Sequence, residues 1–252
     1  MMRKKGLLQV YNDSLTYKEI LKKSFIDRII ALKKYDEINI KAKDIDDIRI
    51  DFKNKNLFII VDGEEIYVKF MTFPKVKKEK LHAIIKSELQ YRFKNIDNIM
   101  FTYQIVKDNG SSLDVIVFCL NWSKSNLIKK CTERGGKIKG IFPIQFCIFN
   151  NYKNRIKDKN YILIFIHENI LYLLACVDNK MIANSVIKTF TENSFIDELK
   201  KFQVKCSISQ EHNQFNKIFF LNFPYKTLIK DAEKQYSCID LGNDCCDNNY
   251  FA

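Results

Sequence analysis

Apolar and polar positions are patterned most clearly between residues 57 and 93. Leu57–Val61 is an unbroken apolar run, and Glu65–Phe70 alternates like a strand with one buried face. Asp62-Gly63 lies between the two runs, and such a dipeptide between strands is a strong signal of a hairpin. Phe73-Pro74 ends the second run, because proline has no N–H to donate to a neighbouring strand. We therefore predict two strands joined as a β-hairpin.

A helix is predicted directly after these strands. Its apolar side chains recur at intervals of three and four residues, as on one face of an α-helix. They are Leu81, Ile84, Ile85, Leu89 and Phe93. Most charged residues of the segment fall on the other side, so the pattern predicts an amphipathic helix that ends near Phe93.

The first fifty residues allow two interpretations. Leu7–Leu21 can form a hairpin around residues 12 and 13, or a helix can begin after Ser14, because apolar residues keep a helical spacing there. We favour a hairpin first and a helix from about Ser24. A short strand and a loop are expected between Ile38 and Ile50.

Strands and helices alternate in the middle of the chain. Strands are predicted at Ile99–Val106, Asp114–Leu120 and Ile138–Phe142, and the second is buried because it is almost entirely β-branched or aromatic. A helix capped by Ser123 should end at Gly135-Gly136. Another helix should span Ile144–Tyr152, with Pro143 in its first turn.

The second half of the chain continues this mixture without a sequence repeat. We expect a hairpin of Tyr161–Ile166 and Ile170–Val177, a strand at Met181–Phe190, a helix capped by Asn193, a strand at Ile218–Phe223 and a helix at Tyr225–Lys234. Ser237–Ala252 is polar and should be loose. The pattern indicates a mixed α/β protein in two lobes.

The composition fits a folded protein with a sizeable core. Of the 252 residues 46% are hydrophobic, which excludes a disordered chain. The formal net charge is +12, and a basic protein can bind nucleic acid or anionic lipid. The lysines are evenly spread, so we attribute the charge mainly to a composition rich in Lys, Ile and Asn. No apolar run approaches the ~18 residues of a membrane helix, and without a signal peptide the sequence predicts a cytosolic protein.

No cluster of residues predicts catalysis or metal binding. The eight cysteines contain no C-x-x-C pair, and only three histidines are present, so a zinc site is not expected. His82 should be solvated on its helix, His167 should lie at a hairpin tip, and His212 in a loop. No spacing suggests a Ser-His-Asp or Cys-His arrangement. We predict no catalytic residue and no metal ligand.

The central segment resembles the PilM family of type IV pilus assembly proteins. The residues that carry the resemblance are Val68–Pro74, Leu81, Ile84, Glu88, Phe93 and the strand that begins Phe101-Thr102-Tyr103. A buried strand, a helix that ends at a glycine, and a strand leading into another helix follow in the family's order. The resemblance covers about Leu57–Tyr152 and continues more weakly to Phe223. The cytoplasmic domain of the type II secretion protein GspL is similar in build.

The resemblance implies an α/β, actin-like (ribonuclease-H-like) fold of two lobes with a small inserted α+β subdomain. Residues 1–75 and 141–157 should form the first lobe, and residues 76–140 the inserted subdomain. Residues 158–235 should form a shortened second lobe, and residues 236–252 a loose C-terminal tail.

The sequence departs from the nucleotide-binding pattern of that fold. Phosphate turns need glycine, because backbone N–H groups must approach the phosphate closely. The corresponding stretches are Val10–Ser14, Ile164–Asn169 and Asn222–Pro224, and none contains glycine. Phe165 stands where an aspartate is expected, and His167 where a glycine is expected. We predict that the chain neither binds ATP tightly nor hydrolyses it, and that it holds no cofactor. Asp240-Leu241-Gly242 is assigned to a terminal helix or the tail and not to a displaced phosphate loop.

The resemblance also implies a function. The chain would be a non-catalytic cytoplasmic scaffold at the inner face of the membrane, and would bind the N-terminal tail of an inner-membrane, PilN-like pilus protein. An apolar groove between the main lobe and the inserted subdomain would hold that tail. Its predicted lining is Phe73, Leu81, Ile85 and Phe142.

Two alternatives stay open. One is an actin-like ATPase whose nucleotide loops have drifted. The other is a basic nucleic-acid-binding module. The second is disfavoured, because such modules expose aromatic side chains and many of the 20 Phe and 12 Tyr here fall at inward positions.

Overall fold

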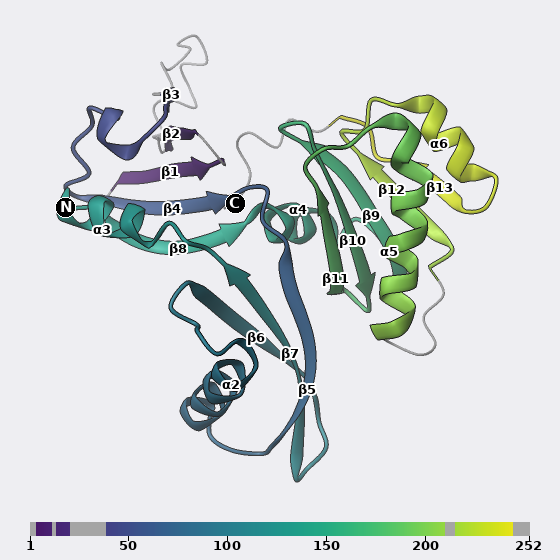
Figure 1. Ribbon diagram of the computed structural model, residues 1–252, viewed down its shortest axis with the longest axis horizontal. Coiled ribbons are helices and arrows are strands. Elements are labelled where there is room, and N and C mark those ends of the chain that lie inside the picture. Colours follow the sequence, from purple (N-terminus) through teal and green to yellow (C-terminus); the bar gives the residue numbers. More distant parts are fainter. Residues whose placement is uncertain (1–3, 12–13, 21–38, 210–214, 244–252) are drawn as a thin grey trace, which may run out of the picture. The chain divides into compact units, whose positions relative to one another are not determined.

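The computed structural model describes residues 4–11, 14–20, 39–209 and 215–243 (Figure 1). The chain divides into two compact units. The first unit is Met1–Gly63 with Ser123–Phe146, and the second is Glu64–Trp122 with Cys147–Ala252. Each unit is described by itself.

The first unit is built on a five-stranded sheet. Its strands, in spatial order, are β3 (Asn39–Ala42), β2 (Leu15–Ile20), β1 (Lys4–Val10), β4 (Lys55–Val61) and β8 (Lys137–Pro143). β1 and β2 form an antiparallel hairpin, which confirms the favoured interpretation of Leu7–Leu21, while β4 and β8 run parallel to β1. The helix predicted from about Ser24 lies outside the described residues.

Short helices complete this unit. They are η1 (Ile45–Asp47), α3 (Ser125–Glu133) and the start of α4 (Ile144–Tyr152), which follows β8 directly. The predicted cap at Ser123 is wrong, because Lys124 is the cap residue of α3 and no side chain caps the helix. Gly135, with a φ of 79°, follows the helix as expected. The guanidinium of Arg134 donates to the carbonyl oxygens of Ile45 and Ile50, each at 2.6 Å, and so ties the segment after β3 to α3.

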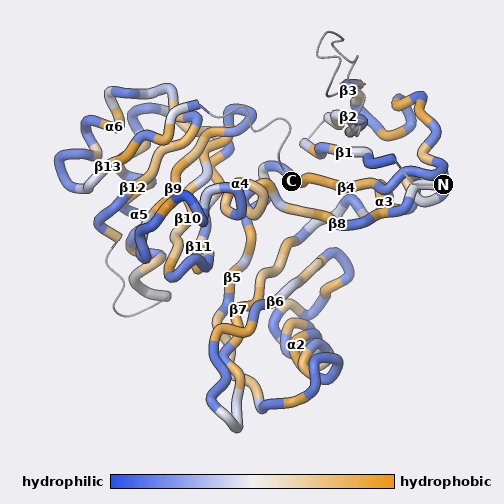
Figure 2. The backbone as a smooth tube through the Cα atoms, turned by 180° about the vertical axis from the view of Figure 1, so that it is seen from behind, coloured by the Kyte–Doolittle hydropathy of each residue, from blue (hydrophilic) through white to orange (hydrophobic). Residues whose placement is uncertain are grey.

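The hairpin predicted around Asp62-Gly63 is wrong. β4 has β1 on one edge and β8 on the other, so no edge is left for β5 (Ile66–Pro74), which pairs with β7 instead. Figure 2 shows β4 as a mainly hydrophobic segment, as is typical of a parallel strand buried on both faces. Gly63 has a φ of 75°. The dipeptide therefore links a strand of one sheet to a strand of another and does not form a hairpin turn.

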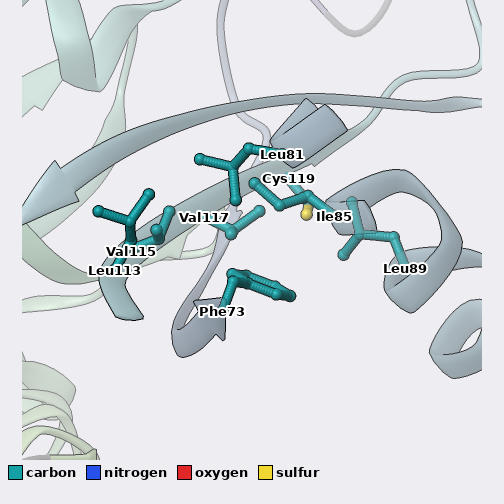
Figure 3. Close-up of a cluster of buried hydrophobic side chains, with 8 residues drawn as sticks. All are labelled: Phe73, Leu81, Ile85, Leu89, Leu113, Val115, Val117 and Cys119. Atoms are coloured by element: carbon teal, nitrogen blue, oxygen red, sulfur yellow. The ribbon is translucent and has the colours of Figure 1, made fainter. Parts of the chain in front are cut away.

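The second unit begins with a three-stranded antiparallel sheet. Its order is β5, β7 (Ser112–Asn121) and β6 (Ile99–Asp108), and α2 (Lys78–Phe93) covers one face (Figure 1). Figure 3 shows the core between helix and sheet. It consists of Phe73, Leu81, Ile85, Leu89, Leu113, Val115, Val117 and Cys119. The predicted helix and the strands predicted at Ile99–Val106 and Asp114–Leu120 are confirmed.

A second five-stranded sheet forms the rest of this unit. Its strands, in spatial order, are β11 (Lys180–Ile187), β10 (Ile170–Val177), β9 (Asn160–His167), β12 (Lys217–Leu221) and β13 (Ser237–Asp240). The helices are η2 (Glu192–Ser194), α5 (Phe195–Ser209) and α6 (Lys226–Glu233). The predicted hairpin of β9 and β10 is confirmed. Asn193 lies inside η2, whose cap residue is Thr191, so the predicted cap is wrong.

The C-terminal segment is more ordered than the sequence suggested. Residues 237–240, predicted to be loose, form β13, which pairs in parallel with β12. A strand of only four residues can form here because the neighbouring strand β12 is buried and offers its backbone groups as hydrogen-bond partners. Residues 244–252 lie outside the described part of the chain.

The two five-stranded sheets share one topology, although the sequence shows no repeat. In each, three consecutive strands form an antiparallel meander, and two later strands add in parallel on the side of the first strand. β1, β4 and β8 in the first sheet therefore correspond to β9, β12 and β13 in the second.

The observed sheets do not follow two of the expected boundaries. β5 pairs in the three-stranded sheet, although residues 66–74 were expected in the first lobe, and residues 137–140 belong to β8 of the first sheet. Asn184 of β11 also exchanges two hydrogen bonds with the backbone of Ile66, at 3.0 and 2.6 Å. The inserted sheet is thus tied to the second five-stranded sheet, and the remaining predicted ranges stay predictions.

Candidate functional site

The carboxyl edge of the first sheet gathers polar groups. The parallel strands β1, β4 and β8 end at the same edge, the position where α/β sheets bind ligands. Tyr11 follows β1, Asp62 follows β4, and Gln145 follows β8 by two residues. The N–H of Asp62 donates to the carbonyl oxygen of Val10 at 3.0 Å, which holds the ends of β1 and β4 together.

Asp62 and Gln145 are buried although both are polar. Their relative exposures are 2% and 0%, and a buried carboxylate is costly unless hydrogen bonds or charges stabilise it. The ammonium of Lys124 lies at the same edge and donates to the carbonyl oxygen of Tyr11 at 2.7 Å. This edge therefore combines an acid, an amide and a cation, and it is the candidate functional site of the first unit.

Sequence reasoning missed these three residues. Asp62 was assigned to a hairpin turn, and Gln145 and Lys124 were not singled out. The available signal was the unbroken apolar run before Asp62, which is typical of a central parallel strand. A polar residue directly after such a strand lies at the ligand-binding edge.

The carboxyl edge of the second sheet is formed by β9, β12 and β13. The N–H of Asn222, after β12, donates to the carbonyl oxygen of Gly242 at 3.0 Å, and the N–H of Leu241 donates to that of Phe220 at 2.8 Å. Hydrogen bonds from Lys226 and from the N–H of Gly242, together with the Lys226 charge, lower the pKa of Asp240. Asp240-Leu241-Gly242 is therefore part of this edge, and its assignment to a loose tail is wrong.

Gly242 at this edge has a φ of 78°, but two other turns at this edge keep a left-handed backbone without glycine. Glu168 and Asn169 connect β9 to β10 with φ angles of 48° and 61°, and Asn222 has a φ of 51°. Asparagine tolerates this region better than most residues. Each of these residues carries a Cβ, which glycine lacks, and a Cβ restricts how closely the backbone can approach a phosphate. Residues 12 and 13, between β1 and β2, lie outside the described part.

The aromatic residues at the expected motif positions belong to the core. Phe165 is 0% exposed and stacks on Tyr172 with ring centroids 4.7 Å apart. Phe223 is 1% exposed and packs against Phe220 at 5.0 Å and Phe195 at 5.3 Å. Side chains buried among other rings cannot position a metal or a phosphate.

The four residues predicted to line the partner groove come from two different units. Phe73, Leu81 and Ile85 are 8%, 1% and 0% exposed, and they form part of the core under α2 (Figure 3). Phe142 belongs to β8 in the first unit, is half-buried, and stacks on Phe58 at a centroid distance of 6.5 Å. The burial of the first three explains their apolar character without a partner. Binding of a partner by these residues stays a prediction.

The remaining candidates for chemistry are explained by packing. His82 is exposed and stacks on Phe101 at 4.7 Å, and His212 lies outside the described residues. Burial raises the pKa of Cys119 and of Cys131 to about 11, so both thiols are protonated at neutral pH and are poor nucleophiles. Within the described ranges, no group of His, Cys, Asp and Glu could hold a metal ion. No helix in the described part is long and apolar enough to cross a membrane.

Several solved structures of other proteins resemble this chain in fold. A Bacteroides thetaiotaomicron protein of unknown function with an actin-like ATPase fold is 10% identical, with a TM-score of 0.55, over 98% of this chain and 93% of that chain. A PilM–PilN type IV pilus biogenesis complex contains a chain that is 7% identical, with a TM-score of 0.62, over 97% of this chain and 91% of that chain. The cytoplasmic domain of EpsL, from the type II secretion system of Vibrio cholerae, reaches a TM-score of 0.49 at 6% identity, over 86% and 81%.

Sequence comparison adds no relative to these structures, because no family model and no curated protein matches the chain. The shared fold is therefore visible only in three dimensions. In both of the first two structures the match extends over nearly the whole of this chain. This chain has an actin-like fold.

Proposed function

We propose that this protein is a non-catalytic scaffold of a type IV pilus or related secretion machine. It works at the inner face of the cell membrane and binds the cytoplasmic tail of an inner-membrane protein. The proposal is supported by the PilM–PilN complex, in which a chain of the same fold is bound to a partner. It is also supported by the resemblance of Leu57–Tyr152 to the PilM pattern.

The observation that carries the non-catalytic part is the replacement of phosphate turns by core packing. Phe165 and Phe223 are buried in aromatic contacts at positions where the nucleotide-binding pattern needs an aspartate and glycines. To restore a phosphate-binding turn at these two positions, each phenylalanine would have to be replaced by a smaller residue, and the surrounding aromatic side chains would have to repack. A chain of this kind is suited to binding other proteins.

The positive charge of the protein, which follows mainly from its lysine-rich composition, would add a weak attraction towards an anionic membrane. The formal net charge is +12, and the cytoplasmic leaflet of a bacterial membrane carries anionic lipids that attract basic proteins. A membrane-embedded partner would add specific binding to this weak attraction.

The partner is tested by affinity purification of the tagged chain from its native cell after membrane solubilisation. We expect a protein with one membrane helix and a short cytoplasmic tail, and a synthetic peptide of that tail should bind the purified chain. Recovery of soluble proteins only, or a peptide that does not bind, would contradict the proposal.

The contribution of Phe142 is measured with the same peptide. Phe142→Ala should weaken binding about tenfold if this ring contacts the tail, because buried aromatic anchors dominate such interfaces. Ile141→Ala is the matched control, since neighbouring strand residues point to opposite faces of the sheet. Equal affinities of both variants would exclude Phe142 from the interface.

The non-catalytic part is tested by thermal unfolding with Mg·ATP. A nucleotide present at 100 times its Kd would stabilise the protein by about 2.7 kcal/mol, which corresponds to roughly 5–10 °C in Tm for a chain of this size. We expect no shift with ATP or ADP. A shift of that size would support an ATP-binding member of the fold.

A further inference from the structure

Two segments of the chain are rich in lysine and arginine, and they differ in what their cations contact. Residues 75–94, which include α2, contain seven cations and two acids. Residues 124–139, which include α3, contain six cations and one acid. The sequence alone does not distinguish these two segments, but the structure does.

Most cations around α3 bind groups of the protein itself. The ammonium of Lys130 pairs with the carboxylate of Asp44 at 3.0 Å. Lys124 and Arg134 donate to backbone carbonyl oxygens. These charges stabilise contacts within the first unit, so they are not freely available to an external anion.

Most cations around α2 have no such partner. Lys75 pairs with Asp108 at 2.6 Å, and Arg92 pairs with Glu88 at 2.8 Å. The other five lysines are exposed, and none of their ammonium groups makes an ion pair or a hydrogen bond within the residues that the structure describes. They are Lys77, Lys78, Lys80, Lys86 and Lys94. The remaining acid of the segment is Glu79, so α2 presents a strong excess of positive charge to solvent.

The outer side of α2 is smooth as well as basic. The helix buries one side against the three-stranded sheet (Figures 1 and 3), and its opposite side faces solvent. Residues three or four apart share a helix face, so the exposed Ala83, Ser87 and Gln90 form a row along this side, with Lys80 and Lys86 flanking it. The 16 residues of α2 extend over about 24 Å, with lysines at both ends.

Tyr91 adds an aromatic ring to the same side. It lies one helical turn after Ser87 and is 85% exposed, more than any other large hydrophobic side chain in the described residues. A tyrosine ring has an apolar body and a polar tip, and such rings are enriched at the boundary between lipid and water.

We propose that the outer side of α2 binds the surface of an anionic lipid bilayer. The five lysines lie near the lipid phosphates, and the ring of Tyr91 lies among the headgroups. The inference rests on the proposed function for the location of the chain, and it names the surface that lies against the membrane. Each lysine near such a surface contributes about 1 kcal/mol, or roughly fivefold in affinity.

The composition of this side favours a bilayer over a macromolecular partner. Protein interfaces are depleted in Lys, Ser and Ala and depend on buried aromatic anchors, whereas this side consists of such small and charged residues with one ring. Sites for single-stranded nucleic acid place several aromatic rings beside their cations. His82, the other exposed ring on α2, already stacks on Phe101. A convex helix with flexible lysines fits a broad, fluid anionic surface.

Binding is measured by co-sedimentation of the full chain with vesicles. We expect binding to phosphatidylethanolamine vesicles that contain about 30% phosphatidylglycerol, and none to phosphatidylcholine vesicles, because the attraction requires anionic lipid. Raising the salt from about 0.05 to 0.3 M should weaken binding, since salt screens exposed charges. No binding to the anionic vesicles at low salt would overturn the proposal.

A triple variant locates the binding surface. Lys78→Gln, Lys80→Gln and Lys86→Gln together should weaken vesicle binding on the order of 100-fold. Glutamine has a helix propensity close to that of lysine, so the fold should be kept, and circular dichroism checks this. The matched control removes three exposed lysines from other elements, with the same change in net charge. It combines Lys157→Gln, Lys200→Gln and Lys230→Gln, and should weaken binding less than tenfold. Equal losses in the two variants would show that net charge, and not α2, is responsible.

Fluorescence tests which side of the chain meets the lipid. The emission of Tyr91→Trp should shift to shorter wavelength on anionic vesicles, because the indole enters a less polar environment. The unmodified chain controls for Trp122, which is buried at 4% exposure. Val204→Trp, at a 61% exposed position of α5, should show no shift. A shift for Val204→Trp and none for Tyr91→Trp would overturn the proposal.

Two further measurements separate this proposal from its neighbours. The α2 triple variant should bind the tail peptide of the proposed partner as tightly as the unmodified chain does, since no lipid is involved. Peptide binding without vesicle binding would overturn the lipid surface alone, and vesicle binding without peptide binding would overturn the partner alone. If the triple variant loses binding to a DNA duplex at about 0.15 M salt but keeps its binding to vesicles, the surface binds nucleic acid and the proposal is wrong.

Discussion

The two five-stranded sheets share a strand order but differ in what they bury. In the second sheet, Tyr161–Phe165 of β9 and Leu171–Cys176 of β10 are fully buried and almost entirely apolar. Most buried polar residues of the described chain lie in the first unit. They are Gln9, Thr16, Glu19, Asp62 and Gln145, against Asn184 in the second unit. One topology is thus stabilised in two different ways.

A buried ion network stabilises the first sheet. The carboxylate of Glu19, 2% exposed, accepts from the ammonium of Lys55 at 2.8 Å and from that of Lys4 at 3.0 Å. Lys55 also donates to the hydroxyl of Tyr17 at 3.2 Å. Burial alone would raise the pKa of Glu19, but the hydrogen bonds and charges of Lys55 and Lys4 outweigh it and lower this pKa.

Aromatic packing stabilises the second sheet. Phe165 and Tyr172 stack across β9 and β10, and Phe195 of α5 packs against Phe220 and Phe223. Such contacts are insensitive to pH and salt. The two sheets therefore share a pattern of backbone hydrogen bonds that defines their topology. Their core residues differ, and these residues decide how the stability of each sheet depends on pH and salt.

The largest effect is expected from the apolar sheet. Phe165→Ala should lower the free energy of unfolding by about 3–5 kcal/mol, because it leaves a cavity in a fully buried site. Urea denaturation measures the loss, which should be equal at neutral and acidic pH. Phe190→Ala is the matched control: this half-buried ring should cost less than half as much. Similar losses for both variants would contradict the tight packing at β9.

A somewhat smaller and pH-dependent loss is expected from the ion network. Lys55→Met leaves the Glu19 carboxylate buried without its nearest cation and should cost roughly 3 kcal/mol at pH 7. The folded-state pKa of Glu19 is lowered, so its pairing stabilises the native chain above the unfolded pKa of about 4.5 and is lost as the pH falls through the folded pKa. The difference between native chain and variant should therefore shrink towards pH 3.

Two controls sharpen this result. Glu19→Gln combined with Lys55→Met removes both charges and should cost less than Lys55→Met alone. A loss from Lys55→Met that is the same at pH 7 and pH 3 would show that packing, not charge, stabilises the first sheet as it does the second.

The smallest effect is expected at the turn between β9 and β10. Asn169 has a φ of 61°, so Asn169→Gly should stabilise the protein by about 0.5–1 kcal/mol, since glycine adopts this region without steric cost. Asn179, in the turn from β10 to β11, has a similar φ of 57°. Asn179→Gly should therefore stabilise the protein by a similar amount. A loss at either position would mean that the asparagine side chain holds the turn.

Local patterns predicted most elements, and the errors have physical causes. The amphipathic spacing of α2 and the turn before Ile170 were read correctly, because their signals are contained within a few residues. The hairpin at Asp62-Gly63 was wrong because a dipeptide specifies a turn but not the partner of each strand. The caps at Ser123 and Asn193 were wrong because no side chain caps α3 or η2, and without such a cap the sequence places a helix start only to within one or two residues.

The sequence by itself determined that this chain has a large apolar core, mixed strands and helices, and no glycine at the turns where a phosphate would be held. Only the tertiary structure decided that β4 lies between β1 and β8, that Asp62 and Gln145 meet the same edge, and that β13 completes the second sheet. Strand partners and buried polar contacts join residues far apart in the chain. Their free energy depends on which surfaces meet, and periodicity within one segment does not encode that.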